Sequence, residues 1–228
     1  MNTNVNLSVP LGAMALLGTG FLFFVSALVL IQSLVVRKRG RAKFVLLVML
    51  VIAGGYLAAI LSFSLVSHEK VLARGEEKHF CEIDCHLAYS VANTRQAKTL
   101  GNPPNQSNAQ GTYTVVTIRT RFDETTISPT RGDGLLYPNS RVLMLVDERG
   151  NKYSPSTEGQ RALEAAQNGG TPMTAPLRPR GSYTTEVVFD LPLDVKAATL
   201  LVNEGEWETH FVIGHENSPL HRQTRFQL

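Results

Sequence analysis

Acidic residues are missing from the first 67 residues of this 228-residue chain. All 19 Asp and Glu residues come later, and the only charges before them are Arg37, Lys38, Arg39, Arg41 and Lys43. The net charge of +3 therefore combines a basic N-terminal segment of +5 with a remainder of −2. A basic excess confined to one short loop does not support nucleic-acid binding.

Other absences narrow the class of protein further. Two cysteines are too few for a small fold held together by disulfides. The sequence has no internal repeat at solenoid periods. It also lacks a nucleophile elbow, a phosphate-binding loop and a metalloprotease helix motif. We therefore expect a protein without enzymatic activity.

Two long apolar runs occupy the N-terminal segment. Residues 11–36 and 44–67 carry no charged side chain. About 20 apolar residues in a helix cross a hydrocarbon core of about 30 Å, and lipid requires every backbone group to be hydrogen-bonded internally. The sequence of residues 1–67 therefore predicts a transmembrane helical hairpin that lies in the lipid bilayer as its partner.

The position of the basic loop predicts the orientation of this hairpin. Lys and Arg in short loops stay on the cytoplasmic side, so residues 37–43 are expected inside and both termini outside the cytoplasm. Residues 1–10 contain no basic side chain, and the following run is too long for a cleaved signal peptide. Residues 68–228 are then expected to form an extracytoplasmic domain, in the periplasm or at the cell surface.

Alternation with a period of two marks the second part of the chain. Thr112–Phe122, Ser182–Phe189, Thr199–Val202 and Glu208–Ile213 are predicted strands, as is the short apolar run Arg141–Asp147, with further strand structure in Lys78–Val91. Thr157–Asn168 is the one predicted helix, capped by Ser156 or Thr157, and Gly101–Gly111 is predicted to be a mobile loop. The pattern favours an all-β antiparallel sandwich with one short inserted helix.

Three stretches carry a resemblance to a known family. The succession LMLVDERGNKYSPS, APLRPRGSYTTEVVFDLPLD and ATLLVNE is similar to telokin-like, immunoglobulin-fold domains of bacterial surface proteins. The similarity covers Thr112 to Val202 and departs from the family at Arg180-Gly181, where Pro-Gly is usual. It implies an immunoglobulin-like sandwich in an extracytoplasmic location and no particular activity, because fold does not determine function.

One short segment is chemically suggestive. His79, Cys81, Cys85 and His86 lie within eight residues, and thiolate and imidazole ligands suit copper or zinc. In a straight strand Cys81 and Cys85 would be about 13 Å apart, too far for a disulfide, whereas a turn at residues 82–84 would bring them together. A disulfide, two free buried thiols, and a metal site of Cys81, Cys85 and His86 remain open alternatives, with the disulfide favoured outside the cytoplasm.

These observations lead to two functional hypotheses. The first is a membrane-anchored extracytoplasmic module that binds or scaffolds a protein or envelope partner, without a cofactor. The alternative is a copper-binding or redox accessory protein that uses Cys81, Cys85 and His86. The other four histidines, His68, His210, His215 and His221, are expected at the surface.

Overall fold

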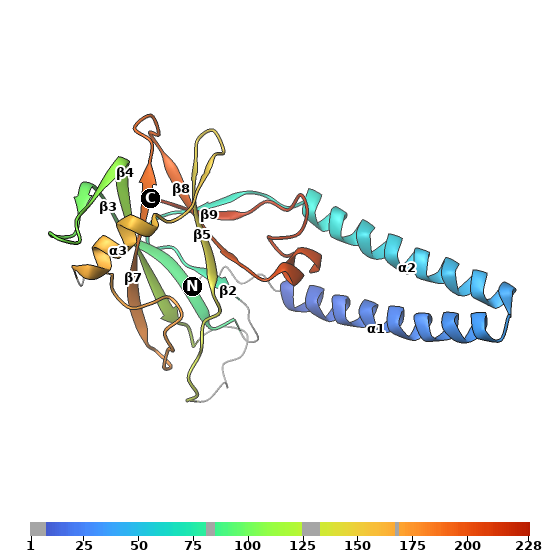
Figure 1. The fold of residues 1–228 in the computed structure, drawn as a ribbon. Helices are drawn as coiled ribbons and strands as arrows, with labels where there is room; N and C mark the ends of the chain where they lie inside the picture. The colour runs from blue at the N-terminus through green and yellow to red at the C-terminus, as the bar shows by residue number, and fades with distance from the viewer. Residues whose placement is uncertain (1–7, 81–84, 125–132, 167–168) are drawn as a thin grey trace. The chain divides into compact units, whose positions relative to one another are not determined.

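The computed structural model describes residues 8–80, 85–124, 133–166 and 169–228 (Figure 1). The chain divides into two compact units. The β domain consists of residues 69–205 and 223–228, and the helical unit consists of residues 7–68 and 206–222. The sequence boundary predicted at residue 67 does not anticipate that residues 206–222 return to the helical unit.

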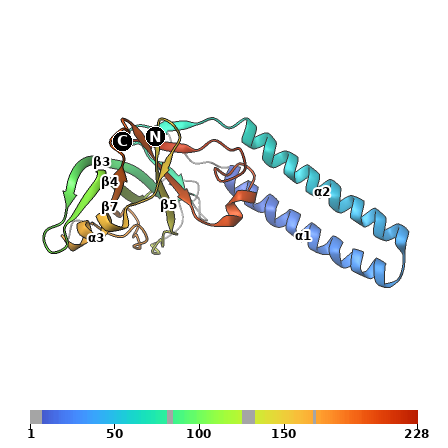
Figure 2. The same ribbon diagram turned by 45° about the horizontal axis from the view of Figure 1, so that its top comes forward.

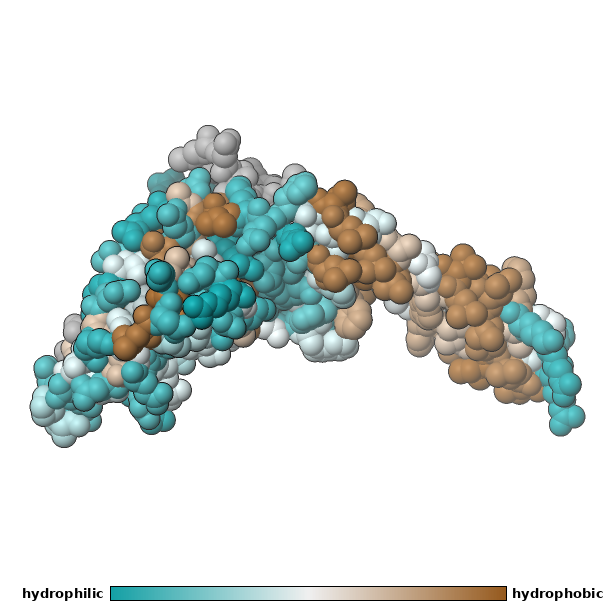
Figure 3. Space-filling model, turned by 90° about the horizontal axis from the view of Figure 1, so that it is seen from above, coloured by the Kyte–Doolittle hydropathy of each residue, from teal (hydrophilic) through white to brown (hydrophobic). Residues whose placement is uncertain are grey.

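Two long antiparallel helices form most of the helical unit. Helix α1 spans Ser8–Val35 and helix α2 spans Arg39–Leu65, so each is about 40 Å long at 1.5 Å per residue. Both are long and apolar enough to span a membrane. Their apolar side chains point outward, with Phe21 65% and Leu50 63% exposed, and the visible face of the hairpin is largely hydrophobic (Figure 3).

The turn between the two helices is closed by backbone hydrogen bonds. Lys38 N donates to Ser33 O at 2.8 Å, and Arg37 N donates to Leu34 O at 3.0 Å. This pair of bonds is the Schellman arrangement, which places its central residue in the left-handed region. Arg37 takes that place with φ of 56°, although glycine is the usual residue there. The basic loop therefore has a defined conformation.

The β domain contains two sheets (Figure 2). The five-stranded sheet has the order β1 (Lys70–Leu72), β9 (Thr224–Gln227), β8 (Ala198–Glu204), β5 (Arg141–Asp147), β6 (Lys152–Tyr153). The four-stranded sheet has the order β2 (Lys78–Phe80), β3 (Leu87–Leu100), β4 (Ser107–Phe122), β7 (Ser182–Leu191). Strand β1 pairs with β9 in parallel, and the other named pairs are antiparallel. The predicted antiparallel arrangement therefore has one parallel exception.

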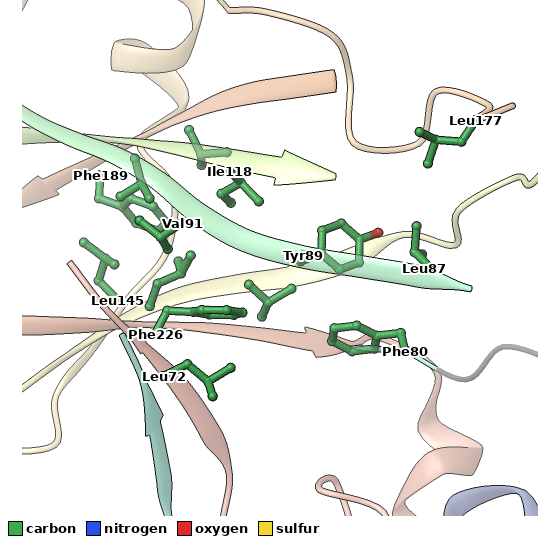
Figure 4. Close-up of a cluster of buried hydrophobic side chains, with 14 of the residues drawn as sticks. Leu72, Phe80, Leu87, Tyr89, Val91, Ile118, Leu145, Leu177, Phe189 and Phe226 are labelled. Carbon is green, nitrogen blue, oxygen red and sulfur yellow. The ribbon is translucent and has the colours of Figure 1, made fainter. Parts of the chain in front are cut away.

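A single hydrophobic core lies between the two sheets (Figure 4). Tyr89 and Phe189 from the four-stranded sheet and Leu145, Leu200 and Phe226 from the other are all inaccessible to solvent. Alternate residues of each strand point to the same side, which explains why the period-two pattern of the sequence marks the buried positions. The arrangement is sandwich-like, with apolar side chains of both sheets in one cluster.

Helix α3 (Thr157–Ala165) covers the outer face of the four-stranded sheet. It begins where predicted, because the Ser156 hydroxyl accepts a hydrogen bond from Gly159 N at 3.2 Å. Leu163 packs against Tyr113, Val115 and Val188 in a second, smaller core. The predicted end at Asn168 lies outside the described residues, and the observed helix ends at Ala165.

Two predictions about local structure are wrong. Residues Glu208–Ile213 were expected as a strand, but Trp207–Phe211 form a short 3-10 helix, η1, in the helical unit. The predicted loop Gly101–Gly111 is shorter, because β3 extends to Leu100 and β4 begins at Ser107. In both places the segment has a partner that the sequence pattern did not reveal: Tyr56 of the hairpin bonds Phe211 of η1, and Thr99 and Leu100 pair with Asn108 and Ser107.

Candidate functional site

The predicted cysteine site is only partly described. Cys81 lies outside the described residues, so the disulfide and the copper alternative both stay predictions. Cys85 is inaccessible to solvent and has a left-handed backbone with φ of 58°. His86 is 2% exposed. Both residues therefore belong to the interior at the start of β3.

His86 is held by backbone and ring contacts. Its Nδ1 is hydrogen-bonded to the carbonyl oxygen of Asp123, and Asp123 N donates to His86 O at 2.7 Å. The imidazole stacks on the Phe122 ring with a centroid separation of 5.0 Å. These contacts join the start of β3 to the end of β4.

A network of ion pairs lies beside His86. The Asp123 carboxylate is hydrogen-bonded to His79 Nε2 at 2.8 Å and lies 3.0 Å from an Arg121 guanidinium nitrogen. The same guanidinium donates to both Glu77 carboxylate oxygens at 2.6 Å. We call Glu77, His79, Arg121 and Asp123 the Arg121 cluster. Sequence analysis did not identify it, because its members come from segments about 40 residues apart.

The arginine of the Arg121 cluster already pairs with both of its carboxylates. One ligand atom each from Glu77, His79 and Asp123 lies within 4.8 Å of the others, a spacing that could hold a metal ion. However, a bidentate arginine satisfies Glu77 and also contacts Asp123. The hydrogen bonds to Glu77 raise the pKa of Arg121 above its ordinary value. A cation would have to displace this guanidinium, so the cluster is better explained as a structural link between Glu77, at the start of β2, and β4.

A second polar region is open to solvent. A cleft of about 670 Å³ lies between the two sheets at one end of the β domain. One wall comes from β3, β4 and β7, the other from β5, β8 and β9, and the loops at Arg74 and Lys196 complete the rim. Val146, Leu191 and Ala198 supply apolar surface. We call this hollow the inter-sheet cleft.

Several charges of the inter-sheet cleft are already paired within the protein. Arg225 pairs with Glu69 at 3.1 Å, and Arg95 pairs with Glu186 at 3.0 Å. By contrast, Arg74 and Lys196 make no ion pair with any residue that the structure describes. Among the described residues, the cleft cations that remain available to a ligand are therefore Arg74 and Lys196, which lie on different loops of the rim.

Asp147 lies in the same cleft but is engaged by its own turn. Its carboxylate accepts hydrogen bonds from Asn151 N and Nδ2, both at 2.8 Å, from Arg149 N at 2.9 Å and from the Tyr153 hydroxyl at 3.0 Å. Desolvation raises the pKa of Asp147, but the hydrogen bonds from Asn151, Tyr153 and Arg149 outweigh it, and the pKa lies below its ordinary value. Asp147 therefore shapes the wall and has little capacity left for a ligand.

Two hydroxyl groups in the cleft have no hydrogen-bond partner among the described residues. Thr114 is 3% exposed, and neither its Oγ1 nor the buried Oγ1 of Thr94 forms a hydrogen bond with the described part of the chain. A buried polar atom without a partner costs free energy, so native proteins normally satisfy it with protein, water or ligand. A bound molecule or an ordered water that reached these hydroxyls would satisfy them. Sequence analysis missed them, because threonine is common in strands and the two are 20 positions apart.

Comparison with known proteins adds no functional assignment. The chain matches no known protein family, and no curated protein is detectably similar to it. A conserved hypothetical protein from Bacillus anthracis is similar at 12% identity and a TM-score of 0.42, over 57% of this chain and 87% of the other. The secreted Mycobacterium tuberculosis protein MPT63 is similar at 12% identity and a TM-score of 0.44, over 72% of this chain and 100% of the other. Similarity at these scores carries no argument, and the resemblance to telokin-like domains stays a prediction.

Proposed function

We propose that this protein is a membrane-anchored extracytoplasmic binding module. In this proposal helices α1 and α2 cross the bilayer, the loop at residues 37–43 lies in the cytoplasm, and an immunoglobulin-like β domain lies on the opposite side. The outward apolar side chains of the hairpin support the anchor, because they have no protein surface to cover them. The five basic residues of the loop support the orientation.

The observation that carries the binding role is the inter-sheet cleft. It combines apolar walls with unpartnered hydroxyls on Thr94 and Thr114, as ligand sites commonly do. The unpaired Arg74 and Lys196 at its rim favour a partner segment that carries an anionic group as well as hydrogen-bonding groups. We propose that a protein or another envelope component supplies that segment.

Site-specific photo-crosslinking of the full-length protein in its native membrane tests this role. A photoreactive phenylalanine at Gln96, which lines the cleft, should capture the partner. In an Arg74→Glu/Lys196→Glu variant the yield should fall about tenfold or more, because each lost charge-assisted contact is worth roughly 1.5 to 3 kcal/mol. Equal capture by the native protein and the charge-reversed variant would exclude the cleft as the binding site.

The matched control uses a position away from the cleft. Arg119 is exposed on the opposite face of β4 from the core residue Ile118. A photoreactive residue there should capture different proteins or none. The same adduct at Gln96 and Arg119 would mean that capture reflects crowding at the membrane surface, and the binding proposal would fail.

A further inference from the structure

Residues 206–222, which we call the return segment, are attached to both helices of the hairpin. The Tyr56 hydroxyl of α2 donates a hydrogen bond to the Phe211 carbonyl at 2.7 Å. Arg222 N donates to the Ser67 hydroxyl, just beyond α2, at 2.8 Å. These contacts place the return segment at the end of the hairpin opposite the basic loop.

Close backbone contact with α1 adds a third attachment. A Cβ atom at Gly12 would lie 2.1 Å from the Ile213 carbonyl oxygen, so only glycine permits this approach. Gly18, two turns further along α1, has no atom within 4 Å of the corresponding position. The need for glycine is therefore specific to the place where the return segment lies against α1.

The contact with Tyr56 indicates how deep the return segment lies. Tyr56 precedes the last residue of α2, Leu65, by about 13 Å along the helix axis at 1.5 Å per residue. A tyrosine side chain spans only part of that distance, so the Phe211 carbonyl lies beside α2 instead of beyond its end. A backbone carbonyl at the edge of lipid needs a donor, and Tyr56 supplies it.

The return segment exposes large apolar side chains at this level. Trp207 is 67%, Phe211 47% and Leu220 68% exposed, and the rings of Trp207 and Phe211 meet edge to face at 5.4 Å. The nearby hairpin residues Leu11 and Leu65 are 68% and 72% exposed. Tryptophan concentrates at membrane boundaries, because its ring is apolar while its N–H can reach water.

We propose that the return segment is a membrane-interface element, in which Trp207, Phe211 and Leu220 enter the boundary of the lipid bilayer. It sets the depth of the outer end of the hairpin, while Glu206 and Glu208 stay in the aqueous phase. A lipid surface fits better than a protein partner, because the exposed side chains continue the apolar surface of two helices suited to lipid. This inference rests on the hairpin spanning the bilayer, as proposed above.

The chain contains a single tryptophan, so its fluorescence reports on the return segment alone. The full-length protein is placed in phosphatidylcholine vesicles that contain lipids with a nitroxide quencher near the headgroup or deep in the acyl chain. We expect Trp207 emission to be blue-shifted and quenched most by the shallow nitroxide. The reference is a Trp207→Phe/Leu193→Trp variant, whose tryptophan replaces a residue of the β domain that is 72% exposed. Acrylamide in water should quench this reference more strongly than Trp207.

Two further variants test the attachment to the hairpin. Gly12→Leu should displace the return segment and cause a loss of quenching by the shallow nitroxide, whereas Gly18→Leu should retain the native quenching. If Gly12→Leu does not fold, Tyr56→Phe removes only the hydroxyl donor and should shift the quenching in the same direction. Native quenching in both Gly12→Leu and Tyr56→Phe would contradict the attachment.

Two outcomes would overturn the inference itself. Trp207 emission that acrylamide quenches as strongly as the reference would place the segment in water. Blue-shifted emission without nitroxide quenching would mean that another protein, or a second copy of the chain, covers Trp207. Washing the membranes with alkaline carbonate distinguishes failure of the interface element from failure of the anchor. If the wash extracts the full-length chain, the spanning hairpin is refuted. If the chain is retained and Trp207 is in water, only the interface element is refuted.

Discussion

The two units of this protein place apolar side chains of the same kind in opposite positions. In the β domain Phe189 and Leu200 are inaccessible to solvent, whereas Phe21 and Leu50 on the hairpin are 65% and 63% exposed. Apolar groups leave water either by packing into a protein core or by entering lipid. The contrast supports the proposal that the hairpin lies in lipid, whereas burial inside the protein stabilises the β domain.

The largest expected effect compares two phenylalanines. Phe189→Ala should lower the free energy of unfolding of the β domain by about 3 to 5 kcal/mol, because it leaves a cavity in the core. Phe21→Ala, on the exposed surface of α1, should change that free energy by less than about 0.5 kcal/mol. Urea unfolding of the detergent-solubilised full-length protein, followed by tyrosine circular dichroism, measures both. Equal losses would contradict the division into two solvents.

Buried and exposed groups can also be compared among the ion pairs of the β domain. Asp123 has a side chain only 6% exposed, and its loss would leave His79 without its carboxylate and remove one of the two carboxylates around Arg121. Asp123→Ala should therefore cost about 3 kcal/mol of stability. The matched control is Arg149→Ala, because the pair Arg149–Asp194 is more than 60% exposed on both sides and solvent screening should leave it little effect on stability. A small loss for Asp123→Ala in the same unfolding assay would mean that the Arg121 cluster does not stabilise the fold.

The turn at Asp147 predicts a dependence on pH. Its pKa in the folded protein lies below the unfolded value of about 3.9, so its hydrogen bonds stabilise the fold above that pH. This contribution is lost as the pH falls toward the folded-state pKa. The stability of the native protein should therefore fall more steeply below about pH 4 than that of Asp147→Asn. Thermal unfolding between neutral and acidic pH compares the two proteins, and parallel curves would show that the turn does not contribute.

The smallest expected effect concerns the inter-sheet cleft. Thr114→Val replaces a hydroxyl that has no partner among the described residues by a methyl group of similar size. Since an unsatisfied buried hydroxyl is costly, the free protein should be unchanged or stabilised by up to about 1 kcal/mol. Partner capture at Gln96 should fall in the same variant. A clear destabilisation would mean that Thr114 serves the fold and not a ligand.

Sequence patterns that depend on neighbouring residues were sufficient to predict several helices and strands. The apolar runs at residues 11–36 and 44–67 correspond closely to α1 and α2. A short apolar run predicted Arg141–Asp147, which is strand β5 as expected, and Ser156 marked the start of α3. These signals are local, because capping, helical length and period-two alternation each depend on residues close together in the chain.

Elements that depend on distant partners were missed or misplaced. Strand β1 pairs with β9 across about 150 positions, and neither short strand has enough residues to show a period. His215 was expected at the surface but is 6% exposed within the return segment. Phe211 and Ile213 alternate as a strand would, yet they lie beside the hairpin and not in a sheet.

The change from membrane-type to domain-type composition can be located from the sequence alone, because charge and apolar length are properties of a single segment. It also determined most strand positions, since alternation reflects the two faces of a sheet. Tertiary contacts alone bring Arg121 to Glu77 and Asp123, form the cleft with Arg74 and Lys196 at its rim, and return residues 206–222 to the hairpin. Each of these features joins residues far apart in the chain, and their contact energies arise only after the backbone has brought them together.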